Sequence, residues 1–482
     1  MHKGGNYAQN MVMKQLDEIT SKFETESNAV TRELSVRGKK YGLVIFPDLS
    51  DTATVRAIVL ALQSQSAPAP LDKVKTEVLF ECESEKSDNI DDCINGLLSG
   101  DVLLAAEDEE GYLIINARSY TTRGVVEPPT ETVMRGPREG FIEDLKTNLS
   151  LLERRLKTPD LAIERMQIGR RSDTSVALCY LSSVAQPKVV KKIKKRLNEI
   201  DIDGIVDSHY LVPYLEEKPL SLFSQVGVSE KPDVVAAKIL EGRVGIFVDG
   251  SPMVLTLPFL MVEDFQAAED YYQRPTYTTF LRCLRYAGLI LATLLPALYV
   301  ALQNFHYKLI PVRFMITLMS AIKGLPLSPL SETLFVLLLF EIIREASVRM
   351  PRAVGMAMSI VGALVLGETA VNAGIISSPA VMVTALSSIA LFTVPNQIGT
   401  MSILRIGYTV IAGLTGLFGL TLSVLFTLHY ICALNAYGAP YLAPFAPLVY
   451  NDFKDTIDRV PLPDMNTRPD SIPNINRRRQ AK

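Results

Sequence analysis

The pattern of hydrophobic positions divides this chain of 482 residues near residue 279. Before that point, short apolar runs alternate with amphipathic stretches and polar turns, as in soluble α/β proteins. After it the apolar runs lengthen, and this second part alone raises the mean hydropathy of the chain to +0.20. The pattern predicts two small α/β subdomains followed by an α-helical domain that crosses a membrane several times.

The first subdomain is expected to span residues 31–121, after an N-terminal tail of residues 1–30. Apolar positions that alternate predict strands, and a spacing of three to four residues predicts helices. Gly100 in the LLSGD turn is expected to end the second helix. The predicted elements are a strand over Tyr41–Phe46, a helix over Ala53–Gln65, a helix from Ser87 or Asp88 to this turn, and a hairpin of Val102–Ala106 with Tyr112–Asn116.

The second subdomain is expected over residues 141–275. Residues 122–140 before it are rich in Gly and Pro, which indicates an ordered connector. The connector contains a motif of five residues: Arg135, Gly136, Pro137, Arg138 and Glu139. The predicted elements of the subdomain are a helix over Ile142–Leu156, strands over Ala162–Gly169 and Ser175–Leu181, helices over Val189–Leu197 and Asp233–Glu241, and a hairpin of Val244–Val248 with Met253–Leu257.

The membrane domain is expected over residues 276–434, with four or five spans plus one re-entrant segment. Arg282 and Arg285 precede the first apolar run and indicate its cytoplasmic end. Leu309–Ile322 is too short to cross a bilayer and contains Pro311, so it is predicted to be re-entrant or interfacial. The predicted crossings are Tyr286–Leu302, Thr333–Ile343, Ala353–Ile376, Ala380–Val394 and Ile403–Cys432.

The two ends of the chain are both expected on the cytoplasmic side. The N-terminus lacks the apolar core of a secretory signal. The C-terminal tail, residues 435–482, ends in Arg477, Arg478 and Arg479, which favours the cytoplasm and an even number of spans.

Glu368 is the one ionisable side chain in the 52 residues between Arg352 and Arg405. A carboxylate in hydrocarbon costs roughly 2.5–3.5 kcal/mol on insertion scales, so such a residue normally faces protein or water. We interpret Glu368 as a functional site; the alternative is a protonated or hydrogen-bonded glutamate inside a helix bundle.

The helix that carries Glu368 has two stripes. Small residues at every fourth position predict close packing against a neighbouring helix: Gly355, Ser359, Ala363 and Gly367. The second stripe has apolar positions and a polar end: Val354, Met358, Val361, Val365, Glu368 and Asn372. Around an oligomer axis this row would form a hydrophobic constriction with an acidic collar, which would gate ions and favour cations. The alternative is that the row is packed core.

Glu341, Arg344 and Glu345 are spaced so that all three lie on one helix face near the membrane surface. The arginine could pair with either acid. A structural ion-pair cluster and a gating element are both consistent with this spacing.

Candidate chemistry outside the membrane domain is sparse. The sequence has no GxGxxG, Walker or GxSxG motif, and its five cysteines show no CxxC spacing. The net charge of -3 does not point to nucleic acid. We therefore expect a protein that is not an enzyme, with no cofactor and no metal site.

Five ordered blocks of the sequence are distinctive: RGPREGF (Arg135–Phe141), GRVGIFVDGSP (Gly242–Pro252), DYYQRP (Asp270–Pro275), FEIIREASVRMPRAVG (Phe340–Gly355) and YGAPYLAP (Tyr437–Pro444). Together they resemble the A-subunit family of spore germination nutrient receptors, the GerA family. The resemblance covers most of the chain and leaves out only its two ends.

This resemblance implies a multi-pass protein of the spore inner membrane, surrounded by membrane lipid, with a two-lobed N-terminal domain on the cytoplasmic (spore core) side. It implies two partners, a permease-like B subunit that binds the nutrient and a lipoprotein C subunit. It also implies ring-shaped homo-oligomers, pentamers, that release ions when the nutrient binds and so trigger germination. Relatives often carry an amide at the position matched by Glu368, so the acid is expected to tune conductance or selectivity without being required.

Three alternatives remain open at the level of the sequence. The chain could be a membrane scaffold or signalling subunit without its own pore. It could be a secondary transporter that uses Glu368 as a proton or ion site. It could also be a paralogue that acts in ion or dipicolinate release in place of a nutrient receptor.

Overall fold

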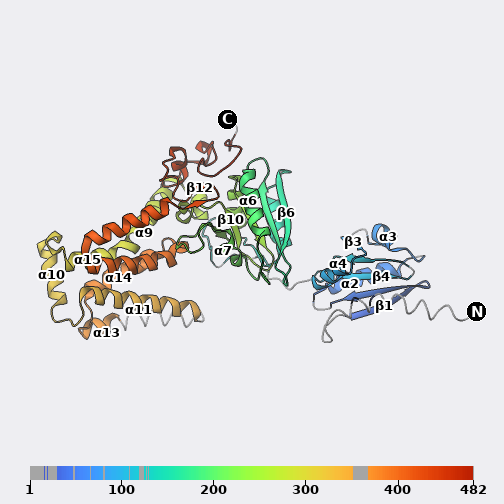
Figure 1. Ribbon diagram of the computed structural model, residues 1–482, viewed down its shortest axis with the longest axis horizontal. Coiled ribbons are helices and arrows are strands. Elements are labelled where there is room, and N and C mark those ends of the chain that lie inside the picture. The colour runs from blue at the N-terminus through green and yellow to red at the C-terminus, as the bar shows by residue number, and fades with distance from the viewer. Residues whose placement is uncertain are drawn as a thin grey trace, which may run out of the picture. The chain divides into compact units, whose positions relative to one another are not determined.

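The computed structural model describes residues 30–46, 49–65, 67–79, 82–107, 109–118, 124–125, 127–128, 130–350 and 367–480, together with Leu16 and Ile19. The chain forms two compact units, residues 1–122 and 123–482. The first unit contains one α/β lobe, called lobe 1. The second contains lobe 2 (residues 141–274, including the turns after its last strand), a helical region (residues 275–432) and a C-terminal segment (residues 435–480) (Figure 1).

Lobe 1 is a five-stranded antiparallel sheet with helices on both faces. Its elements are β1 (Val30–Val36), β2 (Lys39–Ile45), α2 (Thr52–Gln63), α3 (Leu71–Lys73), a π-helical turn (Val74–Val78), β3 (Ser84–Ser87), α4 (Ile90–Leu98), β4 (Val102–Ala106) and β5 (Tyr112–Ile115), with strand order β1-β2-β4-β5-β3. Side chains alternate across a strand, so Leu43 packs with α2 whereas Val44 packs with α4. The described elements confirm the predicted α/β fold.

The sequence did not predict β1 and β3, and it placed residues 1–30 in a tail. Both strands lie at the edges of the sheet, where exposed polar positions hide the alternation. Leu16 and Ile19 are fully buried in the core beside α4, so these two residues belong to lobe 1.

Lobe 2 is also a five-stranded antiparallel sheet, with strand order β6-β7-β9-β10-β8. Its elements are α5 (Leu145–Arg155), β6 (Leu161–Ile168), β7 (Thr174–Leu181), α6 (Pro187–Asn198), α7 (Val212–Leu215), β8 (Gly227–Ser229), α8 (Pro232–Leu240), β9 (Val244–Val248) and β10 (Val254–Leu257). Helix α6 covers one face of the sheet, and α5 and α8 cover the other.

The two lobes repeat one topology. Each begins with a hairpin, continues through a helix to an edge strand, and closes with a helix and a second hairpin, so β1 to β5 correspond in order to β6 to β10. In each lobe a glycine with positive φ precedes the second hairpin, Gly100 (φ 90°) in lobe 1 and Gly242 (φ 101°) in lobe 2. The lobes are therefore structural repeats, which the sequence analysis did not detect.

A buried charged residue follows each of these glycines. Asp101 in lobe 1 pairs with Arg118 at 2.8 Å, and Arg243 in lobe 2 pairs with Glu263 at 3.0 Å. Both Asp101 and Arg243 are 4% exposed. The repeat thus keeps an ion pair at one place in the fold while the charges are reversed.

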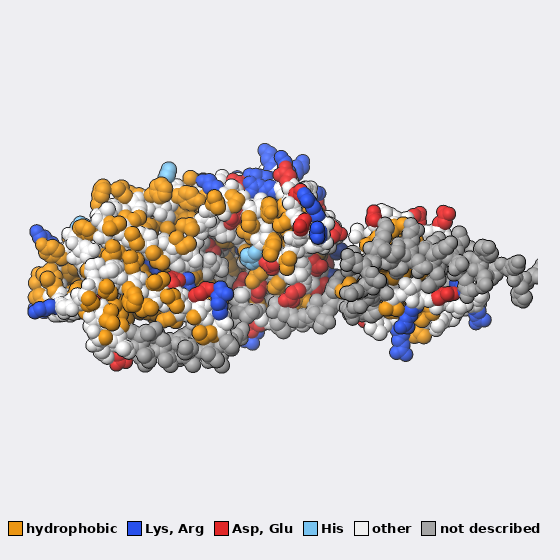
Figure 2. All heavy atoms as spheres, turned by 60° about the horizontal axis from the view of Figure 1, so that its bottom comes forward, with side chains coloured by type: hydrophobic (Ala, Val, Ile, Leu, Met, Phe, Trp, Pro, Cys, Tyr) orange, Lys and Arg blue, Asp and Glu red, His pale blue; other side chains and the backbone are white. Residues whose placement is uncertain are grey.

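The helical region contains α9 (Pro275–Asn304), α10 (Val312–Ile322), α11 (Pro329–Arg349), α13 (Gly367–Asn372), α14 (Ser378–Leu391) and α15 (Ile398–Cys432). Figure 2 shows hydrophobic side chains gathered over its surface, and Phe418 and Phe426 are more than 70% exposed. Large exposed apolar surfaces mark contacts with lipid or protein. Among the described residues, two helices are long and apolar enough to cross a membrane, Pro275–Asn304 and Pro395–Cys432; by itself this is weak support, because buried core helices share these properties.

Helix α15 reverses its direction at Gly416, whose backbone is not helical (φ 71°, ψ -154°). The hydroxyl of Tyr408 donates to Thr427 Oγ1 at 2.8 Å. In a straight helix these two residues would be about 28 Å apart, so the chain must fold back. The sequence predicted a single crossing over Ile403–Cys432, but the structure has two antiparallel halves. The turn was missed because Gly416 lies in an unbroken apolar run.

Both ends of α15 lie beside lobe 2. Gln397, just before α15, contacts Asp264, and Ile431 near the end of α15 packs with Phe223. The C-terminal segment then returns to lobe 2, where the backbone N–H of Ile475 donates to Val184 O at 2.9 Å. The segment, which the sequence analysis describes as a C-terminal tail, is therefore packed against lobe 2.

Arg282 joins the first turns of α9 to the C-terminal segment. Its guanidinium is fully buried and pairs with Asp270 at 3.0 Å and with Asp455 at 3.0 Å. Arg285 pairs with the same Asp270 at 2.8 Å. This cluster, called the root cluster, fixes the position of α9 relative to lobe 2 and the C-terminal segment.

Asp264 links lobe 2 to α15. It lies in the 3₁₀ turn Met261–Phe265, and its Oδ2 accepts a hydrogen bond of 2.6 Å from Gln397 Nε2. Burial raises the pKa of Asp264 from 3.8 to about 6, although the hydrogen bond from Gln397 opposes this shift. The folded chain therefore holds this proton more tightly than the unfolded chain.

We predict that Asp264→Asn stabilises the full-length protein above about pH 7 and has little effect below about pH 4. Since folding raises the pKa of Asp264, the stabilisation from its bound proton is complete at low pH and is lost as the pH rises through about 6. The difference approaches about 3 kcal/mol at high pH. It is measured as the unfolding free energy of both proteins in detergent across this range. Asp203→Asn removes an exposed carboxylate as the control, and a gap for Asp264→Asn that does not change with pH would contradict the prediction.

Candidate functional site

The connector motif is anchored on lobe 2. Gly136 has φ 123°, and a Cβ there would lie 2.6 Å from the ring of Tyr272, so both its backbone and its surroundings require glycine. The carbonyl of Pro137 accepts a hydrogen bond of 2.9 Å from Lys231, whose side chain is fully buried. The backbone N–H of Arg135 donates to Glu269 at 3.0 Å.

Two charged residues of the motif, Arg138 and Glu139, make ion pairs. Glu139 pairs with Arg155 at 2.8 Å and also with Arg154, and these hydrogen bonds lower the pKa of Glu139. Arg138 approaches Glu127 at 3.8 Å. These contacts explain the motif as a structural clamp that holds the connector on lobe 2.

The predicted ion-pair residues of α11 separate into two pairs. Arg344 pairs with Glu341, and Glu345 pairs with Arg349 at 2.6 Å instead of with Arg344. The tertiary structure adds Arg405 of α15, which pairs with Glu341 at 2.7 Å. The sequence did not indicate this partner because it lies 64 positions along the chain.

Arg405 is the centre of what we call the polar cluster, formed by Glu341, Arg344, Arg405, Ser387, Ser388 and Ser402. Its side chain is 1% exposed. It donates to the hydroxyls of Ser387 and Ser388, each at 3.1 Å, so one guanidinium joins α11, α14 and α15. Arg344 donates to Ser402 at 2.8 Å.

The polar cluster carries two arginines and one carboxylate. This excess of positive charge in a largely apolar layer repels cations. The cluster therefore suits a tether between helices and does not suit a binding site on a cation pathway.

Only part of the predicted pore row lies in the described residues. Glu368 and Asn372 lie one turn apart on α13, and both are exposed on the surface of this chain. Val354, Met358, Val361 and Val365 lie outside the described residues, as do Gly355, Ser359 and Ala363 of the packing stripe. Gly367 is the described member of that stripe, and a Cβ there would lie 4.0 Å from Val381 of α14.

A further acid in the helical region, Glu332, was not singled out from the sequence. Glu332 of α11 is fully buried and accepts a hydrogen bond from the backbone N–H of Ser377, at the start of α14. Its other oxygen has no hydrogen-bond partner among the described residues. The sequence signal was weak because Glu332 lies in the first turn of its helix, where an acid is favourable on an exposed surface as well.

We predict that Arg405→Gln lowers the unfolding free energy of the full-length protein by about 2 kcal/mol. Breaking a buried ion pair typically costs about 3–5 kcal/mol, and Glu341 would still keep Arg344 as a partner. The measurement is chemical denaturation in detergent. Arg349→Gln is the matched control, since this exposed pair contributes at most about 1 kcal/mol. Equal losses in the two variants would show that the polar cluster does not hold the helices together.

Comparison with known proteins gives one consistent result. The model of the Bacillus/Clostridium GerA spore germination protein family matches residues 17–471. Spore germination protein KA of Bacillus subtilis is 34% identical over 97% of this chain and 88% of its own length. Spore germination protein GerLA of Bacillus cereus is 34% identical over 95% of this chain and 94% of its own length.

Two further relatives extend the comparison. A Bacillus subtilis protein described as the uncharacterized membrane protein YfkQ is 38% identical over 80% of this chain and 76% of its own length. The crystal structure of the N-terminal domain of the A subunit of a Bacillus megaterium spore germinant receptor is 30% identical, covering 52% of this chain and 96% of that chain, with a TM-score of 0.23. The family match spans most of the sequence, and this chain belongs to the GerA family of spore germination proteins.

Proposed function

We propose that this chain is the A subunit of a spore germinant receptor and forms an oligomeric, nutrient-gated cation channel in the spore inner membrane. The observation that carries the proposal is the stretch of 52 residues with Glu368 as its single ionisable side chain. Glu368 and Asn372 lie where the described part of this stretch begins, and both are exposed on the surface of the single chain. An acid and an amide on one exposed helix face need water or another protein surface as a partner.

The gate in this proposal is a ring of apolar side chains. Copies of the helix that carries Val361 and Val365 surround the axis, and the narrow apolar passage stays dry until it widens. The carboxylates of Glu368 then form a collar that attracts cations. The oligomer we propose is a homopentamer.

The proposed route from nutrient to gate runs through the residues next to the pore helix. Helix α11 ends at Arg349, a few residues before Val354, and the polar cluster ties α11 to α15. Gln397, directly before α15, is in turn hydrogen-bonded to Asp264 of lobe 2. A shift of lobe 2 would therefore move α15 and α11 together and pull on the pore helix.

The proposed partners are a permease-like B subunit that binds the nutrient and a lipoprotein C subunit. Three observations support the membrane location: the apolar surface of the helical region, the two long apolar helices and a relative described as a membrane protein. Lobe 2 and the C-terminal segment pack together, so both must lie on one side of the membrane, which we propose is the cytoplasmic side.

We predict that Val361→Ala raises cation flux through the full-length protein in liposomes several-fold in the absence of nutrient. The smaller side chain weakens the barrier to water at the constriction, so the closed state leaks. Val348→Ala is the control, because Val348 is 80% exposed on α11 outside the predicted row. Unchanged flux in Val361→Ala, with active wild-type protein, would rule out this gate.

Glu368→Gln separates the channel from a transporter in the same assay. In a channel with a tuning acid, the amide keeps the flux and lowers its preference for cations. A transporter that uses Glu368 as its ion site would instead show saturable flux that is lost in Glu368→Gln. Liposomes in which no variant conducts would favour a scaffold without its own pore, or a need for the partner subunits.

A further inference from the structure

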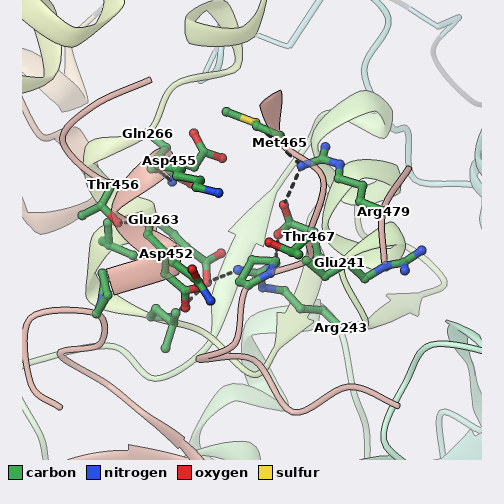
Figure 3. A pocket seen from close by; sticks show the side chains of 17 residues that line it. Glu241, Arg243, Glu263, Gln266, Asp452, Asp455, Thr456, Met465, Thr467 and Arg479 are labelled. Carbon is green, nitrogen blue, oxygen red and sulfur yellow. Dashed lines mark hydrogen bonds and ion pairs between the residues drawn. The ribbon is translucent and has the colours of Figure 1, made fainter. Parts of the chain in front are cut away.

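A polar pocket lies between lobe 2 and the C-terminal segment, away from the helices of the proposed channel (Figure 3). Glu241, Arg243 and Arg479 lie on one side of it, and Asp452 and Asp455 lie on the other. The cavity has a volume of about 60 Å³. Since a cavity needs roughly 10–15 Å³ to hold one water molecule, this pocket has room for a ligand of several heavy atoms.

The carboxylates around the pocket are already engaged within the protein. Glu241 and Glu263 both pair with Arg243. Asp452 accepts hydrogen bonds from the backbone N–H groups of Asp470 and Ser471, each at 2.8 Å.

Asp455 completes the set of acids, because it accepts from Tyr271 at 2.7 Å and pairs with Arg282. Among the described residues, no group of three or more His, Cys, Asp or Glu side chains could hold a metal ion. The acids therefore do not form a cation site.

Three cations of the pocket are not balanced in this way: Lys454, Arg468 and Arg479. Lys454 has no carboxylate within ion-pair distance among the described residues. The nearest carboxylate to Arg479 is Glu241 at 3.8 Å, which is longer than a charge-assisted hydrogen bond. Arg468 donates to backbone carbonyls, including Leu240 O at 2.6 Å.

Two further observations concern arginines of the pocket: the charge of one is poorly compensated, and the other has an unsatisfied N–H donor. Burial and the neighbouring Arg479 lower the pKa of Arg468, which means that its charge is poorly compensated. Arg243 is 4% exposed, and its Nε has no hydrogen-bond partner among the described residues.

We propose that this pocket binds a small oxyanion, of the phosphate or dicarboxylate class, through Lys454, Arg468 and Arg479. Planar guanidinium groups bind such oxygens by paired hydrogen bonds, and a lysine adds a point charge. The ligand would lie beside the contact between the C-terminal segment and lobe 2, where Arg468 of that segment donates to the carbonyl of Leu240.

A ligand bound in the pocket would strengthen the contact between α9 and the C-terminal segment. Asp455 lines the pocket and also pairs with Arg282 in the root cluster. An anion here would fix the C-terminal segment beside the first turns of α9. This inference concerns lobe 2 and the C-terminal segment and does not depend on the proposed channel.

The test is isothermal titration of the full-length protein in detergent at low salt, with inorganic phosphate in one arm and malonate in the other. We expect saturable binding with a dissociation constant of about 1 mM or tighter. Arg479→Gln should weaken it about tenfold or more, since hydrogen bonds to charged groups are among the stronger ones. Lys454→Gln, at an exposed position, is a second variant that leaves the packing of the segment intact.

Arg478→Gln is the matched control, because it removes the same charge one position away, at an exposed residue that does not line the pocket. Binding of phosphate alone would identify a phosphoryl ligand, and binding of malonate alone would identify a carboxylate ligand. Absence of saturable binding up to about 10 mM in both arms, or equal affinities in Arg479→Gln, Lys454→Gln and Arg478→Gln, would overturn the proposal.

Discussion

The buried guanidinium of Arg282 is the contact on which the arrangement of the second unit depends. It pairs with Asp270, just before α9, and with Asp455, which lies 173 positions further along the chain. A fully buried arginine is stable only when carboxylates and carbonyls satisfy it, and Asp455 supplies both, with its carbonyl 2.7 Å away. The C-terminal segment must therefore return to lobe 2 after the last helix. That return places the start of α9 and the end of α15 on the same side of the helical region, next to lobe 2.

The repeat of the lobes places opposite charges at the same position of one fold. The residue after the glycine with positive φ is Asp101 in lobe 1 and Arg243 in lobe 2, and both are buried and paired. In lobe 1 the partner is Arg118, at the end of the lobe itself. In lobe 2 Arg243 faces the pocket that the C-terminal segment closes. The reversed charge thus coincides with the place where the second lobe gains an additional neighbour.

The polar cluster and the pore row divide the charges of the helical region between two roles. Arg405 is enclosed by α11, α14 and α15, where its charge holds helices together. Glu368 is exposed on α13, and no ion pair joins it to another of the described residues. In the proposed channel the first group transmits motion and the second faces the ion path. The separation is physically reasonable, because a buried cation on the path would oppose the passage of other cations.

Local pattern was enough to predict much of this protein. The amphipathic spacing gave α2, α5, α6 and α8 and the two closing hairpins, the long apolar runs gave the helical region, and the ordered blocks gave the family. The spacing on α11 also predicted that Arg344 pairs with one of its two neighbouring acids, and the structure shows that the partner is Glu341. These features depend on residues that are close together in the sequence.

Tertiary structure alone decided the contacts between distant residues. The partners Arg405, Asp455 and Gln397 come from segments far from the residues they touch, and nothing in their local sequence marks them. The reversal at Gly416 was hidden because an apolar helical hairpin and a single long helix have the same hydrophobic pattern. The sequence by itself determined the elements and the family, since these follow from local spacing; the tertiary structure decided which charges meet, because burial makes each of them require a specific partner.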